Sequence, residues 1–181
     1  MDPYRIIAKY YQPGSLAFRI LQIHSEAVAK KACHIAGKLN FAQTDIEFIR
    51  EASLLHDIGI LFTDAPEIGC FGELPYICHG YKGHDLLLSV GLPKHALVCE
   101  RHTGAGLTPG DIDKFGGLLP QRQMEPISIE EKVIAYCDKF FSKDSMDLCI
   151  EKPFESVLES ISRYGEEKGK IFREWHRQFN L

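Results

Sequence analysis

The sequence predicts an all-α fold, and three observations carry that prediction. Apolar residues recur at helical spacing in several long stretches. Proline, glycine, serine and threonine stand where these stretches begin and end. No alternation of apolar and polar residues persists for the length of a strand. At 181 residues the chain can bury a real core, and no linker or repeat divides it, so we expect one helical domain over residues 1–181.

The first helices are marked by their ends. Residues 4–11 form a short helix, and Ser15 then caps a long helix that runs to about Leu39. On the long helix His24 follows Ile20 by one turn on the apolar face, so its ring is expected to point into the core. A single inward histidine is more often a hydrogen-bonded core residue than a metal ligand.

The next helix carries the motif on which the rest of the interpretation depends. We expect it to begin at Thr44 or Asp45, with Glu47 as the partner in a capping box. Its apolar face includes His56, and it is expected to end near Gly59.

Two irregular regions separate the middle helices. Residues 60–77 are rich in proline and glycine, so we expect a loop that forms one wall of a pocket. A helix that begins around Cys78 and carries His79 follows, and then one over residues 94–102 with Pro93 at its first position. Residues 104–127 form the second irregular region.

The last part of the chain is helical again. Ser128, with Glu131 three residues later, is a strong capping-box signal, and the helix that follows has Asp138 on its apolar face. A carboxylate there needs a partner. The C-terminal helices span about residues 153–180, and their apolar stripe is expected to pack on the core or on a second subunit, so a homodimer is one expectation.

The composition excludes several classes of function. With 21 basic and 25 acidic residues the formal net charge is −4, and there is no basic block, so no nucleic-acid partner is expected. No apolar run is long enough to span a bilayer and no signal peptide is recognisable, so we expect a cytoplasmic protein with no membrane partner. The six cysteines are scattered, without a Cys-x-x-Cys pair, and most are expected to be small buried hydrophobic residues.

His56 and Asp57 stand side by side within an apolar run, directly before Ile58 and Gly59. Burying a carboxylate costs several kcal/mol unless a charge or a metal compensates it. A local His–Asp hydrogen bond that ends a helix is the simpler explanation of such a pair. The local hydrogen bond is a less favoured explanation here, because further histidines and one more aspartate occupy inward or helix-end positions.

Six residues therefore form a candidate metal site: His24, His56, Asp57, His79, His102 and Asp138. Imidazoles combined with carboxylates suit Mn, Fe, Co, Ni or Zn. Six donors exceed what one tetrahedral ion takes, so we expect two divalent ions that share a bridging carboxylate, with Asp57 as the natural bridge. His84, on the same helix, is the alternative to His79 as the metal ligand. Asp85 follows His84 and could hydrogen-bond it on a more polar face, so we favour His79.

The motif and its partners resemble the HD-domain metal-dependent phosphohydrolases, and within them the HDIG subset. His56-Asp57-Ile58-Gly59 matches that motif letter for letter, and the resemblance covers about residues 20–143. The partners occur in family order: His24, His79-x-x-x-Gly83, His102-Thr103-Gly104, and Glu131-Lys132 leading to Asp138. The second half is also similar to the YqeK-type branch, whose members hydrolyse dinucleoside tetraphosphates at a di-iron centre.

This resemblance implies a fold and an activity. The fold would be an HD-domain helical bundle with the metal site in its centre, and iron or manganese would be favoured as the metal. The activity would be hydrolysis of a phosphate ester or anhydride by a metal-activated water, as a phosphomonoesterase, phosphodiesterase or nucleotide hydrolase. The substrate would be a small phosphorylated molecule, with a nucleotide favoured. The lysine that often follows the motif is Ile60 here, and no Gly-Tyr-Pro segment of the cyclic di-GMP branch occurs.

In this interpretation Asp57 and His56 are the central catalytic residues, and cationic side chains are needed to hold the phosphate. Four lie near the motifs: Lys82, Arg101, Arg122 and Lys139. Each is also an ordinary candidate for the surface, and we favour Lys82 and Arg101. Two other functions stay open. One is a di-iron oxygenase of HD-type fold, which oxygen-dependent turnover would reveal, and the other is a non-catalytic metal- or nucleotide-binding signalling module.

Overall fold

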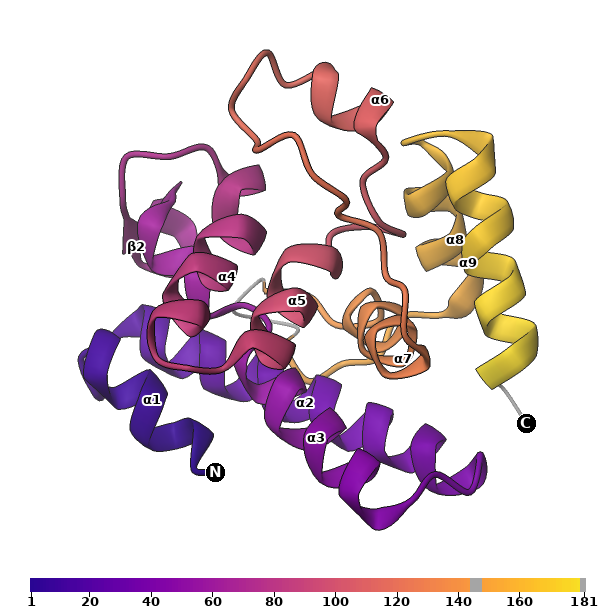
Figure 1. Cartoon of the computed structure of the whole chain (residues 1–181), viewed down its shortest axis with the longest axis horizontal. Helices are drawn as coiled ribbons and strands as arrows, with labels where there is room; N and C mark the ends of the chain where they lie inside the picture. Colours follow the sequence, from indigo (N-terminus) through magenta and orange to yellow (C-terminus); the bar gives the residue numbers. More distant parts are fainter. Residues whose placement is uncertain (144–147, 180–181) are drawn as a thin grey trace.

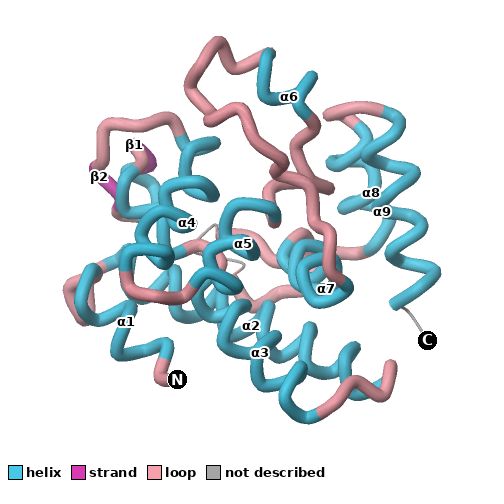
Figure 2. Tube along the Cα trace, in the orientation of Figure 1, coloured by secondary structure: helices cyan, strands magenta, loops and turns pink. Residues whose placement is uncertain are grey.

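The chain folds as a bundle of α-helices, which confirms the predicted class (Figures 1 and 2). The computed structural model describes residues 1–143 and 148–179. Within these residues the α-helices are α1 (Pro3–Tyr10), α2 (Leu16–Lys38), α3 (Gln43–Leu55), α4 (His79–Ser89), α5 (Pro93–Arg101), α6 (Pro109–Asp113), α7 (Ile129–Asp138), α8 (Phe154–Ser162) and α9 (Glu166–Phe179). Residue 180, where the last helix was expected to end, lies outside the described residues.

Three of the predicted helix starts are confirmed. The hydroxyl of Ser15 accepts a hydrogen bond from the backbone N–H of Phe18 at 3.2 Å, which caps α2. Ser128 caps α7 in the same way, accepting from the N–H of Glu131 at 3.2 Å. Pro93 is the first residue of α5, where its missing N–H has no intrahelical partner to lose.

The capping box expected at Thr44 is wrong. α3 begins one residue earlier and its N-cap, Ala42, makes no side-chain cap. The preceding turn explains this, because Asn40 has a left-handed φ of 57° and the N–H of Phe41 donates to the carbonyl of Ala36 at 3.0 Å. That turn is complete at Phe41, so the next helix begins at once and Thr44 lies inside its first turn.

The two irregular regions contain short elements that the sequence did not reveal. α3 ends at Leu55 rather than near Gly59, and the chain continues through the 3₁₀-helices η1 (Ile58–Phe62), η2 (Pro66–Ile68) and η3 (Tyr76–Cys78). Between them β1 (Asp64–Ala65) pairs antiparallel with β2 (Cys70–Phe71), with Asp64 opposite Phe71. In the second region α6 begins with a complete capping box between Thr108 and Asp111.

The helices pack so that five of them, α2, α3, α4, α5 and α7, surround a common centre. α2 and α3 lie side by side, α4 packs on α5 and η1, and α7 packs on α2, α3 and α5 (Figure 1). α8 and α9 form a hairpin against α7. Figure 1 shows the segment that carries α6 arching from α5 to α7.

Two apolar clusters meet along α2, and His24 lies between them. Leu21 belongs to the cluster built with α1, η1 and α4, whereas Val28 belongs to the cluster built with α7, α8 and α9. Phe172 and Trp175 are buried in the second cluster, so the C-terminal apolar stripe packs on the core of its own chain. None of the described helices has the length and apolar character needed to cross a membrane. All six cysteines are free thiols, and four are buried: Cys70, Cys78, Cys99 and Cys137.

Candidate metal centre

The six residues expected to bind metal come together in the centre of the bundle, and each is almost fully buried. His24 projects from the middle of α2. The other five stand at element ends, where the chain turns: His56 after α3, Asp57 before η1, His79 at the start of α4, His102 after α5 and Asp138 at the end of α7. Elements far apart in the sequence therefore deliver one donor set.

The first group of donors, which we call subsite 1, consists of His24, His56, Asp57 and Asp138, with ligand atoms within 4.8 Å of one another. The His24 Nε2 atom lies 3.2 Å from Asp57 Oδ2 and 2.9 Å from Asp138 Oδ1. The His56 Nε2 atom lies 3.1 Å from Asp57 Oδ2 and 3.3 Å from Asp138 Oδ1. Two imidazoles and two carboxylates thus converge on one small volume.

The second group, subsite 2, consists of Asp57, His79 and His102. Both Nε2 atoms lie 3.4 Å from Asp57 Oδ1, and they lie 3.1 Å from each other. Subsite 2 therefore uses the Oδ1 atom of Asp57, whereas subsite 1 uses Oδ2. This is the arrangement expected of a carboxylate that bridges two ions.

Backbone carbonyl groups orient three of the four imidazoles. The Nδ1 atoms of His56, His79 and His102 each lie within 2.6–2.7 Å of the carbonyl oxygen three residues earlier. An Nδ1–H that donates to a carbonyl leaves the Nε2 lone pair directed into the cluster, which is the tautomer a metal ligand needs. The Nδ1 atom of His24 is buried and has no hydrogen-bond partner within residues 1–143 and 148–179.

The electrostatics of the cluster follow from burial and from close charges. Burial raises the pKa of the Asp57 carboxyl, but His56 and Lys143 outweigh it and hold that pKa well below its usual range. For His56 burial lowers the pKa, and the Asp57 charge overcomes it and raises the pKa to about 9. Burial lowers the pKa of His79 to about 3 and also lowers that of His102, so both imidazoles of subsite 2 are neutral at pH 7.

The donor set fits a pair of divalent transition-metal ions. Both oxygens of Asp57 are completely buried, and among the described residues only Oδ2 has a lysine partner, Lys143 at 2.7 Å, whereas Oδ1 faces imidazoles. Buried acceptors of this kind need a compensating positive charge. Two carboxylates and four imidazole nitrogens, split into two groups that share Asp57, offer the mixture of oxygen and nitrogen donors that such ions favour.

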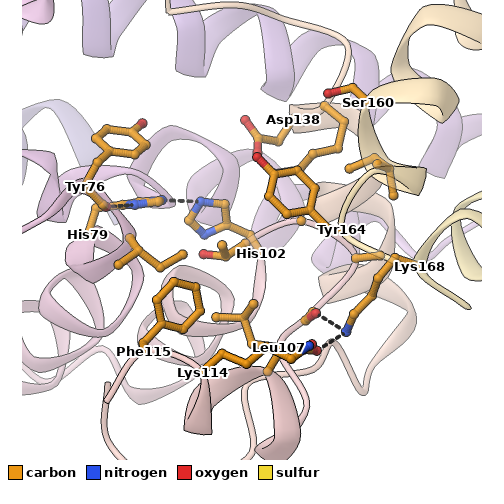
Figure 3. A pocket seen from close by; sticks show the side chains of 18 of the residues that line it. Tyr76, His79, His102, Leu107, Lys114, Phe115, Asp138, Ser160, Tyr164 and Lys168 are labelled. Carbon is orange, nitrogen blue, oxygen red and sulfur yellow. Dashed lines mark hydrogen bonds and ion pairs between the residues drawn. The ribbon is translucent and has the colours of Figure 1, made fainter. Parts of the chain in front are cut away.

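A cavity of about 570 Å³ opens beside subsite 2 and Asp138. His79, His102 and Asp138 line it at the cluster, Tyr164 is drawn beside Asp138, and Lys114, Phe115 and Lys168 line the part farther away (Figure 3). Its volume is in the range of sites for small molecules and cofactors. Tyr76 belongs to the irregular region 60–77, which confirms that this region supplies a pocket wall.

Lysines, rather than the two residues favoured from sequence, surround this cavity. Lys139 and Lys143 line it at the cluster end. The Lys143 ammonium lies 2.7 Å from Asp57 Oδ2, and the Lys139 ammonium pairs with Asp138 Oδ2. Lys168 extends from α9 and donates to the carbonyl of Gly106 at 2.6 Å, which fixes α9 to the segment that carries α6 (Figure 3).

Neither Lys82 nor Arg101 lines the cavity, so the geometry gives no support to a phosphate-binding role for them. Arg101 donates to both carboxylate oxygens of Glu131 at 3.0 and 3.2 Å, which ties α5 to α7. The Lys82 ammonium lies 5.2 Å from the centre of the Tyr81 ring. Their role in holding phosphate stays a prediction from the sequence, because the contacts found for both side chains lie outside the cavity lining.

His84 belongs to a separate polar network, as expected. Its Nδ1 atom lies 3.0 Å from Asp85 Oδ1 and 3.1 Å from a guanidinium nitrogen of Arg122. Arg122 also pairs with the buried Glu100 at 2.5 Å. The ring of His84 is thus engaged away from both subsites, and Arg122 holds the α6 segment on α4 and α5.

Two glycines allow the close approach that brings the motif to α4. A Cβ atom on Gly59 would overlap the carbonyl oxygen of His79 and the backbone nitrogen of Gly83. A Cβ atom on Gly83 would lie 3.2 Å from both the Cys99 Sγ atom and the Gly59 nitrogen. The conformation after His56-Asp57 therefore requires glycine, because α4 packs directly on the backbone of η1.

Comparison with known proteins assigns this fold and site to a family. The HD-domain family profile matches residues 21–142, a span that contains all six residues of the cluster. The chain belongs to the HD-domain family. No solved structure gives a significant match.

Three of its relatives among curated proteins are archaeal. An uncharacterized protein of Methanocaldococcus jannaschii is 37% identical over 97 residues, which is 53% of this chain and 50% of the relative. A protein of Thermoplasma volcanium named tRNA (cytidine(56)-2'-O)-methyltransferase is 31% identical over 148 residues, 77% of this chain and 39% of the relative. A protein of the same name from Picrophilus torridus is 32% identical over 122 residues, 67% of this chain and 31% of the relative. The chain thus spans half or less of the length of these relatives.

Proposed function

We propose that this protein is a metal-dependent phosphohydrolase that acts on a small phosphorylated molecule, with a nucleotide favoured. The observation that carries the proposal is the division of the Asp57 carboxylate between two donor groups, next to a cavity lined by lysines. Paired divalent cations are widely used to catalyse displacement at phosphorus. When bound, such ions supply an acidified water and neutralise charge on the phosphoryl oxygens.

The chain's own residues would hold the ions and orient the substrate. Asp57 would contribute one oxygen to each ion, with His24, His56 and Asp138 on one side and His79 and His102 on the other. The backbone carbonyl groups behind three of the histidines keep those rings in place as the charge in the site changes.

The cavity supports a phosphate with an apolar or aromatic leaving group. Lys139 and Lys143 place positive charge at the cluster end, where the scissile phosphoryl group would lie. Phe115 and Tyr164 also line the cavity and present aromatic surfaces on which a planar group such as a nucleobase would stack. Side chains around the cluster bury its donors and so limit access of bulk water.

A substrate panel tests the proposal. Protein reconstituted with Mn²⁺, Fe²⁺, Co²⁺, Ni²⁺ or Zn²⁺ is incubated with phosphomonoesters, phosphodiesters, nucleotides and dinucleoside polyphosphates, under air and anaerobically. We expect phosphate or nucleotide release in both atmospheres, and loss of release in Asp57→Asn. Turnover that requires oxygen would instead favour an oxygenase, and binding of a nucleotide without turnover would favour a signalling module.

The names of two relatives make tRNA a further molecule for this panel. A charge of −4 and the absence of a basic block argue against it as the main partner. Methyl transfer does not require a carboxylate that is shared by two metal subsites, as that of Asp57 is, so we favour hydrolysis. Methylation of tRNA without any phosphate release would overturn this choice.

A further inference from the structure

We infer that Lys143 and a divalent cation compete for subsite 1, so that subsite 2 binds metal first and subsite 1 binds it more weakly. The inference rests on the metal binding of the proposed function, but not on the hydrolytic reaction.

The position of the ammonium group carries the argument. The Lys143 Nζ atom lies 2.7 Å from Asp57 Oδ2 and 3.9 Å from Asp138 Oδ1. These are the same two oxygens that face the Nε2 atoms of His24 and His56. Lys143 is therefore directed at the carboxylate atoms that define subsite 1.

The two cations exclude each other at this place. A transition-metal ion binds a carboxylate oxygen at roughly 2.0–2.2 Å, so an ion at subsite 1 would stand close to the ammonium and repel it. The Oδ2 atom of Asp138 pairs with Lys139, so Asp138 faces subsite 1 with its Oδ1 atom alone and cannot replace Asp57 Oδ2 with a second oxygen. Binding at subsite 1 thus requires the Lys143 ammonium to leave Asp57.

Subsite 2 carries no such competitor among the described residues. Asp57 Oδ1 faces only His79 and His102 at 3.4 Å, and no ion pair with a lysine or arginine is found at this atom. The Nδ1 atoms of His79 and His102 each lie 2.7 Å from a backbone carbonyl oxygen, which leaves the Nε2 atom of each ring directed at Asp57. The two subsites therefore differ in affinity although they share one carboxylate.

The surroundings give the displaced side chain a place to go. Lys143 lines the cavity of about 570 Å³ and also a second cavity of about 490 Å³, which Glu67, Tyr76 and Lys152 help to form. The side chain of Lys143 is 18% exposed to solvent. Lys143 therefore acts as a displaceable counter-ion of subsite 1 and makes occupation of the two subsites sequential.

Mn²⁺ binding measured by electron paramagnetic resonance tests the inference without any substrate. His79→Ala removes a ligand of subsite 2 and leaves subsite 1 to be measured, and His24→Ala does the reverse. Adding Lys143→Met to His79→Ala is expected to tighten Mn²⁺ binding by about tenfold or more, because a charged hydrogen-bonding competitor is lost. Adding it to His24→Ala should change the affinity by less than about threefold.

Lys139→Met is the matched control. It removes one positive charge next to Asp138 but leaves the Lys143 ammonium in place at Oδ2 of Asp57 and near Oδ1 of Asp138. It should tighten subsite 1 less than Lys143→Met does. Lys143→Gln replaces Lys143→Met if circular dichroism shows that the methionine variant is not folded.

Three outcomes would overturn the competition: equal tightening at both subsites, no tightening at subsite 1, or an equal effect of Lys139→Met. Failure of wild-type protein to bind Mn²⁺ at all would instead overturn the metal site on which the proposed function depends.

Discussion

Replacing Asp57 by asparagine should remove both metal ions at once. The substitution keeps the size of the side chain but removes the charge that serves subsite 1 through Oδ2 and subsite 2 through Oδ1. Asp138 belongs to subsite 1 alone, so Asp138→Asn should weaken one ion and spare the other. His79→Ala should weaken the ion at subsite 2 only. The three variants thus separate a bridge from two one-sided ligands.

The size of the effect follows from linkage. At a metal concentration 100 times Kd, each subsite stabilises the fold by about 2.7 kcal/mol. For a chain of this length, 1 kcal/mol shifts Tm by about 2–4 °C, so each ion raises Tm by about 5–10 °C. Changing a hydrogen-bond partner of a ligand already weakens metal binding about 10–100-fold, so loss of a charged ligand oxygen should cost at least about 100-fold. At the same metal concentration the gain per subsite then falls to about 0.4 kcal/mol, or 1–2 °C.

Differential scanning calorimetry with and without metal measures this gain in each protein. We expect the metal-dependent rise in Tm to be largest in wild type, about half as large in Asp138→Asn and nearly absent in Asp57→Asn. A chelator should return wild type to the Tm of the metal-free protein. An Asp57→Asn variant that keeps half or more of the wild-type rise would refute the bridging role.

Three further predictions concern single positions. His79→Ala should lower the metal content of the purified protein from about two ions to one, while His84→Ala should leave it unchanged. Metal analysis that shows the reverse would mean that subsite 2 contains His84 instead of His79. Gly59→Ala should destabilise the fold by about 3 kcal/mol or more in urea unfolding, because the new Cβ atom would overlap the backbone of α4. Gly37→Ala should stabilise the fold by up to about 1 kcal/mol, because a Cβ atom there would have nothing within 4 Å and alanine favours a helix. Burial raises the pKa of Asp111, but hydrogen bonds from Lys168 of α9 and from the α6 cap outweigh it and lower that pKa. The difference in unfolding free energy between wild type and Asp111→Asn should therefore be full above about pH 4 and shrink as the pH falls further. A difference that stays constant with pH would contradict this.

Much of the cluster was predictable because its residues break a local rule. His24 and Asp138 are polar residues on apolar helix faces, and His56-Asp57 interrupts an apolar run before a glycine. A buried charge without a compensating partner is costly, so such exceptions point to a site. His79 was distinguished from His84 because an aspartate follows the latter, and the structure shows that hydrogen bond at 3.0 Å.

The residues that the sequence did not reveal are those placed by tertiary packing. Lys143 follows the end of α7, where no periodic pattern indicates a direction, yet it reaches Asp57, which lies more than eighty positions earlier. Lys168 looks like a surface residue of an amphipathic helix, but the α8–α9 hairpin turns it onto Gly106. Lys82 and Arg101 lie close to ligands in sequence but do not line the cavity, because closeness in sequence does not decide which side of a helix a side chain takes.

The most direct test of the account is anomalous X-ray diffraction from crystals grown with Mn²⁺ or Fe²⁺ at a concentration that saturates both subsites, with data collected at the absorption edge of the metal. Two anomalous peaks are expected, one among His24, His56 and Asp138 and the other beside His79 and His102, with the Asp57 carboxylate between them. A single peak, or a peak outside this cluster, would contradict the assignment of Asp57 as the bridge of a paired metal centre.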